Sequence, residues 1–216
     1  MNDQFLSYGV VELLNVPHAK YIADEVIRDD CYDLKRIPDG SVVIDLGAFY
    51  GEFSIYCAKV KKCQVVAIEA SLENWRVLSL NLIHNCISSD DVRVVRAAIS
   101  NQCGTVEFSY NAGHPAGSKI GLSQSSHAVE SITLSELIST IPLALHTRSL
   151  VVKMDIEGAE KEVFESIGEW SPVVSIVSME WHNNGGEFYR DALIKHGFQV
   201  TLRTASSGMG FIYASK

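Results

Sequence analysis

The sequence Ser41-Val-Val-Ile-Asp-Leu-Gly-Ala-Phe-Tyr-Gly51 predicts a buried strand that runs into a glycine-bearing turn. Glycines in such a turn let the backbone approach a ligand closely and adopt torsion angles that other residues resist. Gly47 and Gly51 follow the spacing Gly-x-x-x-Gly, whereas a dinucleotide-binding turn uses Gly-x-Gly-x-x-Gly, whose second glycine admits a pyrophosphate. Phe49 fills that second position here. The turn therefore indicates a ligand other than a diphosphate.

The next predicted strand, residues 64–68, ends at Glu69. A carboxylate at the end of a second strand can accept both hydrogen bonds of a ribose diol, which suits an adenosyl ligand. Asp45 adds a further acid two residues before Gly47. Each of these signals is weak alone. Together they favour a nucleoside-type cofactor over a purely structural turn.

Short β-branched runs alternate with helical patterns along the rest of the chain, which predicts an α/β fold. We expect a mostly parallel sheet with helices on both faces. A Ser-Ser-Gly turn joins the last two strands, so the sheet should end in an antiparallel hairpin. The predicted strands are 41–46, 64–68, 92–97, 104–110, 150–154, 173–179, 198–203 and 210–214, and the predicted helices are 51–59, 71–85, a short one after the Thr133-Leu-Ser-Glu136 capping box, 159–167 and 187–196.

Two segments depart from this alternation. Residues 1–40 are expected to form an N-terminal helical cap, with one amphipathic helix over His18–Asp30, ahead of a single globular domain over 41–216. Residues 111–129 are rich in Gly and Ser and are expected to form a surface loop. That loop contains His114 and His127, which we interpret as solvent-exposed.

The composition narrows the class of protein. The chain has 216 residues, of which 47% are hydrophobic, enough for one substantial core. Its 18 basic and 26 acidic residues give a net charge of −8, and no basic stripe is present, so bulk nucleic acid and anionic membranes are disfavoured partners. The five cysteines form no C-x-x-C pair and are expected to be reduced packing residues. We expect a soluble cytoplasmic protein and leave a homodimer open.

Four motifs, in this order and approximate spacing, resemble the FkbM family of methyltransferases over most of the chain. They are Asp45-Leu-Gly-Ala-Phe-Tyr-Gly51, Ile68-Glu-Ala70, Lys153-Met-Asp-Ile-Glu-Gly-Ala-Glu160 and Glu180-Trp-His182. The third is the most specific, because many methyltransferases share the glycine turn. The sequence departs from the family at Phe49 and Tyr50, where relatives often have Asn and a small or apolar residue, and at Ser135, where they often have Asp.

The resemblance implies a Rossmann-like class I methyltransferase fold with a seven-stranded sheet. It also implies S-adenosylmethionine as the cofactor, S-adenosylhomocysteine as the product, and a hydroxyl of a sugar, macrolide or other metabolite as the acceptor. Carried over to this chain, the turn would hold the methionine part of the cofactor and Glu69 its ribose. The full set of expected cofactor-binding residues is Asp45, Gly47, Ala48, Phe49, Tyr50, Gly51, Glu69, Ala70 and Asp155.

Methyl transfer to an alcohol requires alignment of the acceptor and removal of its proton. Asp155 and Glu157 follow one predicted strand, and Glu180 and His182 end the next, so alternation directs each pair to one side. We expect these four residues to be catalytic, with His182 as first choice for the proton acceptor, because an unperturbed imidazole is neutral near pH 7. Lys153 is expected to pair with a carboxylate. The oxygen-rich set permits a divalent ion such as Mg²⁺ but does not require one, so no metal is predicted.

Three functions remain open from the sequence. The first is an O-methyltransferase that acts on a small molecule or glycan. The second is a methyltransferase that acts on RNA or protein, against which stand the acidic balance and the absence of an Asn-Pro-Pro-aromatic motif after the fourth strand. The third is a catalytically inactive cofactor-binding module, which the retained acidic residues and His182 argue against.

Overall fold

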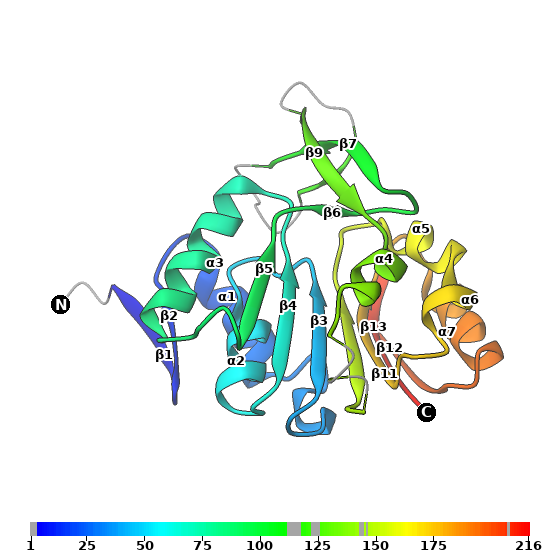
Figure 1. The fold of residues 1–216 in the computed structure, drawn as a ribbon, viewed down its shortest axis with the longest axis horizontal. Helices are drawn as coiled ribbons and strands as arrows, with labels where there is room; N and C mark the ends of the chain where they lie inside the picture. The colour runs from blue at the N-terminus through cyan, green and yellow to red at the C-terminus, as the bar shows by residue number, and fades with distance from the viewer. Residues whose placement is uncertain (1–3, 112–117, 122–125, 143–144, 146, 207) are drawn as a thin grey trace.

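The computed structural model describes residues 4–111, 118–121, 126–142, 145, 147–206 and 208–216. Its main sheet has seven strands in the order β12-β13-β11-β10-β3-β4-β5 (Figure 1). The strands are β3 (Val42–Leu46), β4 (Gln64–Ile68), β5 (Val92–Val95), β10 (Leu150–Met154), β11 (Ile176–Trp181), β12 (Gln199–Ser206) and β13 (Met209–Ser215). Neighbours from β11 to β5 are parallel, while β13 is antiparallel to both β11 and β12. The predicted fold class, including the antiparallel C-terminal hairpin, is confirmed.

Helices cover both faces of this sheet because successive strand residues point to opposite sides. Val43 and Val151 pack into one buried cluster with α2 (Glu52–Lys59) and α3 (Leu72–His84). Ile44 and Val152 pack into a second cluster on the other face. That face is covered by α4 (Leu134–Ser139), α5 (Glu160–Glu165), α6 (Ile167–Trp170) and α7 (Gly186–Lys195). The near-continuous apolar runs of the central strands are those of a sheet buried on both sides.

Helix boundaries follow their capping signals closely. The Ser71 hydroxyl accepts a hydrogen bond from the Asn74 N–H at 3.2 Å and begins α3, and Thr133 does the same for α4 from the Glu136 N–H at 3.0 Å. The predicted helix 159–167 is instead divided at Ser166 into α5 and α6. The predicted strand 173–179 was placed too early: β11 begins at Ile176, since Val173 lies in a turn and its N–H donates to the Trp170 carbonyl.

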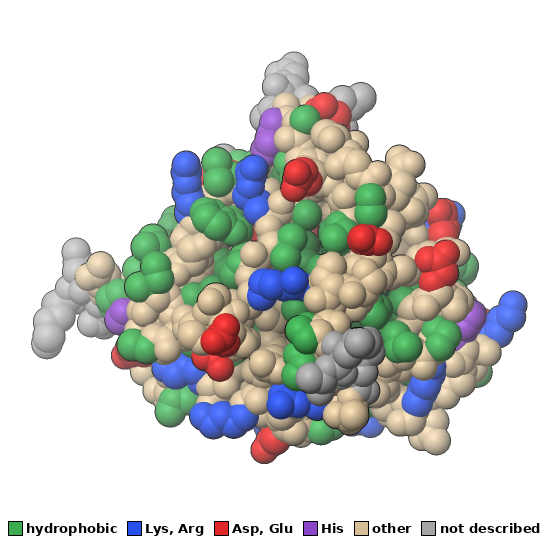
Figure 2. Space-filling view, in the orientation of Figure 1, with side chains coloured by type: hydrophobic (Ala, Val, Ile, Leu, Met, Phe, Trp, Pro, Cys, Tyr) green, Lys and Arg blue, Asp and Glu red, His purple; other side chains and the backbone are tan. Residues whose placement is uncertain are grey.

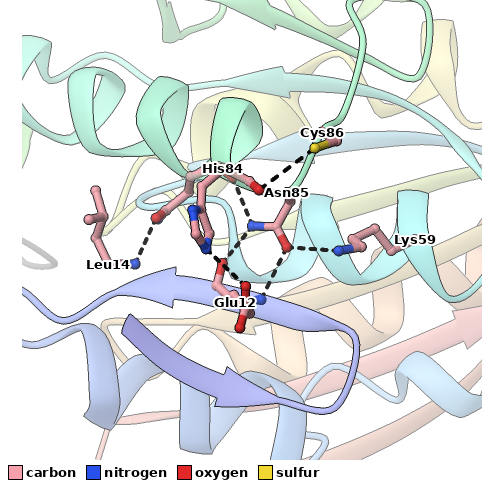
Figure 3. A network of polar contacts seen from close by, with 7 residues as sticks. Glu12, Leu14, Lys59, His84, Asn85 and Cys86 are labelled. Carbon is pink, nitrogen blue, oxygen red and sulfur yellow. Dashed lines mark hydrogen bonds and ion pairs between the residues drawn. The ribbon is translucent and has the colours of Figure 1, made fainter. Parts of the chain in front are cut away.

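The first forty residues contain a β-hairpin that the sequence did not predict. Its strands are β1 (Phe5–Tyr8) and β2 (Val11–Leu14). Figure 3 shows how α3 holds β2: the Asn85 side-chain amide bonds both the N–H and the carbonyl of Glu12, and His84 pairs with the Glu12 carboxylate at 2.9 Å. The expected helix over 18–30 forms as α1 (Ala19–Ala23) followed directly by a π-helical turn (Asp24–Arg28), and a 3₁₀ turn (Leu34–Arg36) comes before β3.

A second, smaller sheet corrects part of the predicted loop 111–129. Its order is β6-β9-β7-β8, from β6 (Ala98–Ile99), β7 (Gly104–Ser109), β8 (Lys119–Ile120) and β9 (Ser126–Ile132). His127 therefore lies on a strand, exposed, with its ring 6.1 Å from that of Phe108, and His114 lies outside the described residues. The strand forms because Val129 and Ser131 are buried at alternate positions of β9 against β7. This sheet lies over the upper edge of the main sheet in Figure 1.

The structure also bears on the state of the cysteines and on the length of the helices. All five cysteines are free thiols in the structure, three of them buried. Among the described residues, no helix is long and apolar enough to cross a bilayer.

Candidate active site

A cavity of about 330 Å³ opens at the carboxyl ends of β3, β10 and β11. The glycine turn after β3 forms one wall, and the four predicted catalytic residues from β10 and β11 form another. A smaller hollow of about 60 Å³ shares Gly47 and Glu69 with it and is lined in part by residues of the small sheet. The larger cavity is lined by Tyr21, Ile22, Glu25, Val26, Tyr32, Gly47, Ala48, Phe49, Glu52, Phe53, Glu69, Asn74, Lys153, Asp155, Glu157, Glu180, His182 and Met209.

The glycine turn is held by close backbone contacts. Gly47 has φ 75°, and a Cβ there would lie 1.8 Å from the Asp155 carbonyl oxygen, so no side chain fits. The N–H groups of Gly47 and Ala48 both donate to the Ile68 carbonyl, at 3.0 and 2.9 Å. Phe49 also has a positive φ, 51°. The turn is therefore built onto the ends of β4 and β10.

Asp45 and Lys153 form a buried ion pair behind the turn. The sheet register places them opposite each other, and Lys153 Nζ lies 3.2 Å from Asp45 Oδ1. Lys153 also donates to the Gly47 carbonyl at 2.8 Å, and Asp45 accepts from the Ser54 hydroxyl at 2.6 Å. Burial opposes the charge on Lys153, but Asp45 and Asp155 outweigh it and raise the lysine pKa. The expected pairing of Lys153 is confirmed, and Asp45, fully buried, supports the turn from behind.

Glu69 binds the turn through its carboxylate. One oxygen accepts from the Phe49 N–H at 2.9 Å and the other from the Ser71 N–H at 2.8 Å. Burial raises the pKa of Glu69 to about 7. Because Glu69 lines both hollows, it borders the space where a nucleoside would lie, and its contact with a ribose stays a prediction.

The other expected cofactor residues are distributed unevenly. Ala48 and Phe49 line the large cavity, and Ala70 lines the small hollow. Tyr50 is missing from the described lining of both, because its ring stacks on Phe49 with centroids 3.7 Å apart and its hydroxyl reaches the Pro17 carbonyl. Gly51 is a packing residue: a Cβ there would lie 2.3 Å from a methyl carbon of Leu78.

Tyr32 joins two of the predicted catalytic carboxylates. Its buried hydroxyl lies 2.8 Å from Asp155 Oδ2 and 3.2 Å from Glu180 Oε2. The Ser178 hydroxyl anchors the Tyr32 backbone carbonyl at 2.6 Å, which fixes this N-terminal segment on β11. Burial, followed by repulsion from Asp155, raises the pKa of Glu180 to about 8. Sequence reasoning missed Tyr32, since no motif surrounds it.

His182 lies among four carboxylates. Its Nδ1 is 2.9 Å from Glu160 Oε1, and its Nε2 is 3.6 Å from Glu180 Oε1 and 3.7 Å from Glu157 Oε2. Burial lowers the imidazole pKa, but Glu160, Asp155 and Glu180 outweigh it and raise the pKa to about 9. The premise that His182 is neutral near pH 7 is therefore wrong, because its neighbours favour the imidazolium. Glu160, only 1% exposed, holds the ring in place.

The same residues offer a ligand set for a cation. Asp155, Glu157 and His182 each place one ligand atom within 4.8 Å of the others. Two carboxylates and an imidazole are ligands that divalent ions accept. The arrangement could hold such an ion, although the sequence predicted none.

Acidic groups dominate the cavity wall. Six carboxylates line it, against the two cationic side chains Lys153 and His182, and they are Glu25, Glu52, Glu69, Asp155, Glu157 and Glu180. An excess of buried carboxyl groups favours a cationic ligand, because a bound cation offsets the cost of ionising carboxyls whose pKa is raised by burial. This wall therefore suits a cationic ligand and repels phosphates. Sequence reasoning missed Glu25 and Glu52, although Glu52 directly follows Gly51 of the cofactor motif.

Solved structures of methyltransferases share this fold. A precorrin-6y C5,15-methyltransferase from Geobacter metallireducens superposes with a TM-score of 0.57 at 12% identity, covering 97% of this chain and 99% of that one. TYW2 of M. jannaschii, solved in complex with AdoMet, gives 0.52 at 12% identity over 97% and 83%. TrmK of M. capricolum, solved in complex with S-adenosyl-homocysteine, gives 0.52 at 8% identity over 91% and 67%. At these identities the likeness concerns the fold alone.

Sequence comparison identifies the family. Methyltransferase sdnD of Sordaria araneosa is 26% identical, covering 91% of this chain and 87% of its own. Methyltransferase 1 of Beauveria bassiana is 21% identical, covering 85% and 82%. The profile of the methyltransferase FkbM domain matches residues 45–200, from the glycine turn to the last hairpin. This chain belongs to the FkbM family of methyltransferases.

Proposed function

We propose that this chain transfers the methyl group of S-adenosylmethionine to a hydroxyl group of a small molecule or sugar, with S-adenosylhomocysteine as the second product. The observation that carries the proposal is the acidic cavity beside the glycine turn. S-adenosylmethionine has a sulfonium and an ammonium group, which such a wall attracts, whereas the diphosphate of NAD would be repelled. A turn with Phe49 at the pyrophosphate position supports the same choice.

The residues present fit this cofactor. Gly47, Ala48 and Phe49 bring the turn to the cavity, and Glu69 lies between the cavity and the smaller hollow. That hollow has the apolar residues Ala70 and Ile99 in its lining, as an adenine ring requires. When bound, S-adenosylmethionine supplies an electrophilic methyl group.

The chain itself must take up the proton of the acceptor hydroxyl. His182 already holds a proton at neutral pH, so its carboxylate neighbours share this role. Burial raises the pKa of Glu157 to about 7 and that of Glu180 to about 8, close to the values that suit a general base near neutrality. In our proposal the ionised form of Glu180, which the neighbouring His182 imidazolium favours, accepts the proton, and Asp155 and Tyr32 position it.

The size and lining of the cavity support the proposed acceptor class. Tyr21, Ile22, Val26 and Met209 give the cavity an apolar side, which suits a metabolite or a glycan with an apolar face. Figure 2 shows Lys and Arg dispersed among acidic, hydrophobic and uncharged side chains on the viewed face, with no basic stripe. With a net charge of −8, this supports a small acceptor over RNA.

Calorimetric titration tests the cofactor. We expect S-adenosylhomocysteine to bind with a Kd in about the micromolar range and NAD not to bind. Glu69→Ala should weaken S-adenosylhomocysteine, because the turn loses its hold on the Phe49 N–H. The matched control is Glu187→Gln, a carboxylate whose side chain is 82% exposed. Equal binding of NAD, or no binding of either ligand, would contradict the proposal.

Transfer of labelled methyl groups to a panel of hydroxylated sugars and metabolites tests the chemistry. Glu180→Gln and His182→Ala should each lower turnover about a hundredfold or more while the affinity for S-adenosylhomocysteine changes little. A cofactor-binding module without catalysis would give no transfer with any acceptor in the wild type. Transfer to tRNA but to no small molecule would favour the RNA alternative.

A further inference from the structure

Glu52 is a buried carboxylate that the proposed reaction does not use. It is the first residue of α2, directly after the glycine turn, and is only 2% exposed. It nevertheless lines the large cavity. Its Oε1 atom is buried and has no hydrogen-bond partner among the described residues. A buried carboxyl oxygen without a hydrogen-bond partner is costly, so its presence at a cavity wall points to a ligand that can satisfy it.

Among the described residues, none supplies a cation for this oxygen. Lys153 lines the same cavity, but its ammonium group is already held by Asp45 at 3.2 Å and the Gly47 carbonyl at 2.8 Å. The other cation in the cavity wall is His182. Glu160 holds its imidazole on the side of the site formed by β10 and β11. Along the described cavity wall no arginine occurs. No cationic partner of Oε1 therefore comes from the described residues, and a ligand in the cavity can supply one.

We propose that Glu52 binds the ammonium group of the methionine part of S-adenosylmethionine. The inference rests on the proposed function and adds to it a residue that selects the amino-acid end of the cofactor. An ammonium group offers three N–H donors and a positive charge, so it can satisfy Oε1. A sulfonium has no N–H to donate, and a metal ion at Asp155, Glu157 and His182 would use a ligand set that does not include Glu52.

The backbone around Glu52 is consistent with this role. Burial raises the pKa of Glu52 to about 8, and the N–H groups of Glu52 itself and of Tyr50, together with Lys153, only partly offset it, so a bound cation would favour the charged carboxylate further. The two N–H groups hold the side chain at the start of α2 without satisfying Oε1. The carboxylate is thus placed beside the turn, on the wall formed by Gly47, Ala48 and Phe49. An ammonium bound there would tie the methionine end of the cofactor to the turn.

The test compares ligands with and without the ammonium group, by calorimetry on the full chain. The three ligands are S-adenosylhomocysteine, its analogue lacking only the amino group (S-adenosyl-4-thiobutyrate), and 5′-methylthioadenosine. Wild type should bind the desamino analogue about tenfold or more weakly than S-adenosylhomocysteine. The affinity of Glu52→Gln for S-adenosylhomocysteine should fall by about the same factor. Its affinity for the two ligands without the ammonium group should change little. The surface control Glu187→Gln should behave as wild type.

Several outcomes would overturn the inference, and they differ from a failure of the proposed function. An unchanged affinity of Glu52→Gln for S-adenosylhomocysteine would remove Glu52 from the site, and an equal loss for all three ligands would show a distorted turn. Should Glu52→Gln fail to fold, an equal affinity of the wild type for S-adenosylhomocysteine and its desamino analogue would be decisive against it. If the wild type binds none of the three ligands, the proposed function is overturned as well.

Discussion

At the scale of single residues, Glu52, the proposed ligand of the cofactor ammonium, should also affect stability. Burial raises its pKa from 4.5 to about 8, so the folded state holds a proton that the unfolded chain has released. Because the pKa is higher in the folded state, proton binding at Glu52 stabilises the fold in full below about pH 4.5. This contribution is lost as the pH rises towards 8. Without ligand, wild type should therefore lose stability over this window. Glu52→Gln should lose roughly 1–3 kcal/mol less, since a neutral amide does not titrate.

Thermal unfolding at a series of pH values, on both proteins without ligand, measures this difference. Glu69, Glu157 and Glu180 titrate in both proteins, so the difference between the two curves isolates Glu52. Parallel curves for the two proteins would show that Glu52 is ionised at no cost and that its oxygen is satisfied within the fold.

The sequence predicted that Asp155, Glu157, Glu180 and His182 lie around one site, but it did not predict the electrostatics of that site. Alternation along a strand placed Glu180 and His182 at one strand end, and the cavity contains both. The charge of His182 depends on Glu160, which lies in the helix that follows the neighbouring strand β10. Glu160 Oε1 lies 2.9 Å from His182 Nδ1. Tyr32 and Glu25 come from the N-terminal segment, whose path over the sheet no local pattern records. Motif spacing describes one element at a time, whereas pKa values depend on all the elements that converge.

At the scale of elements, α3 connects the N-terminal hairpin to the glycine turn. Asn81, fully buried in this helix, accepts from the Leu14 N–H of β2 at 2.8 Å and donates to the Tyr50 carbonyl at 2.8 Å. Asn81→Ala should destabilise the fold by about 2–3 kcal/mol, because it leaves two buried backbone groups without partners. It should also speed hydrogen exchange in β2 and around Tyr50.

Urea unfolding and exchange measured by mass spectrometry test this connection. The control is Ser79→Ala on the same helix, which removes only a hydroxyl bonded to the Trp75 carbonyl within the helix. Faster exchange in β2 alone, with the turn unaffected, would mean that the two segments are held independently.

The elements that the sequence predicted well share strong periodicity and clear caps. The strand 64–68 and the strand 150–154 agree with β4 and β10 residue for residue, since buried parallel strands are continuous apolar runs. The segment around β9 failed because its Ser and His residues resemble a loop, and its alternation becomes visible only beside β7. The hairpin β1–β2 was missed for a similar reason. Side chains of α3 and its C-cap hydrogen-bond to the backbone of β2, an interaction that no propensity scale includes.

At the scale of the whole molecule, side chains of the segment 4–40 belong to the hydrophobic core on one face of the main sheet. Val26, Tyr32, Leu34 and Ile37 are each at most 5% exposed and share one buried cluster with Val43 on the central strand. Removing these side chains from water contributes about 1.5–3 kcal/mol each, a large share of the net stability of a domain. This segment also contributes Tyr32 and Glu25 to the cavity wall. A removable cap would have neither property.

We therefore predict that the full chain unfolds in a single transition and that residues 19–37 unfold together with β3. In urea, fluorescence and far-UV circular dichroism should give coincident curves, and the backbone amides of both segments should exchange at the same limiting free energy. S-adenosylhomocysteine at about a hundred times its Kd should shift the entire transition by about 2.7 kcal/mol, since its site needs both segments. An early transition confined to residues 1–40, with ligand stabilising only the later one, would contradict this prediction, because it would mean that the cofactor site forms without Tyr32 and Glu25 in place.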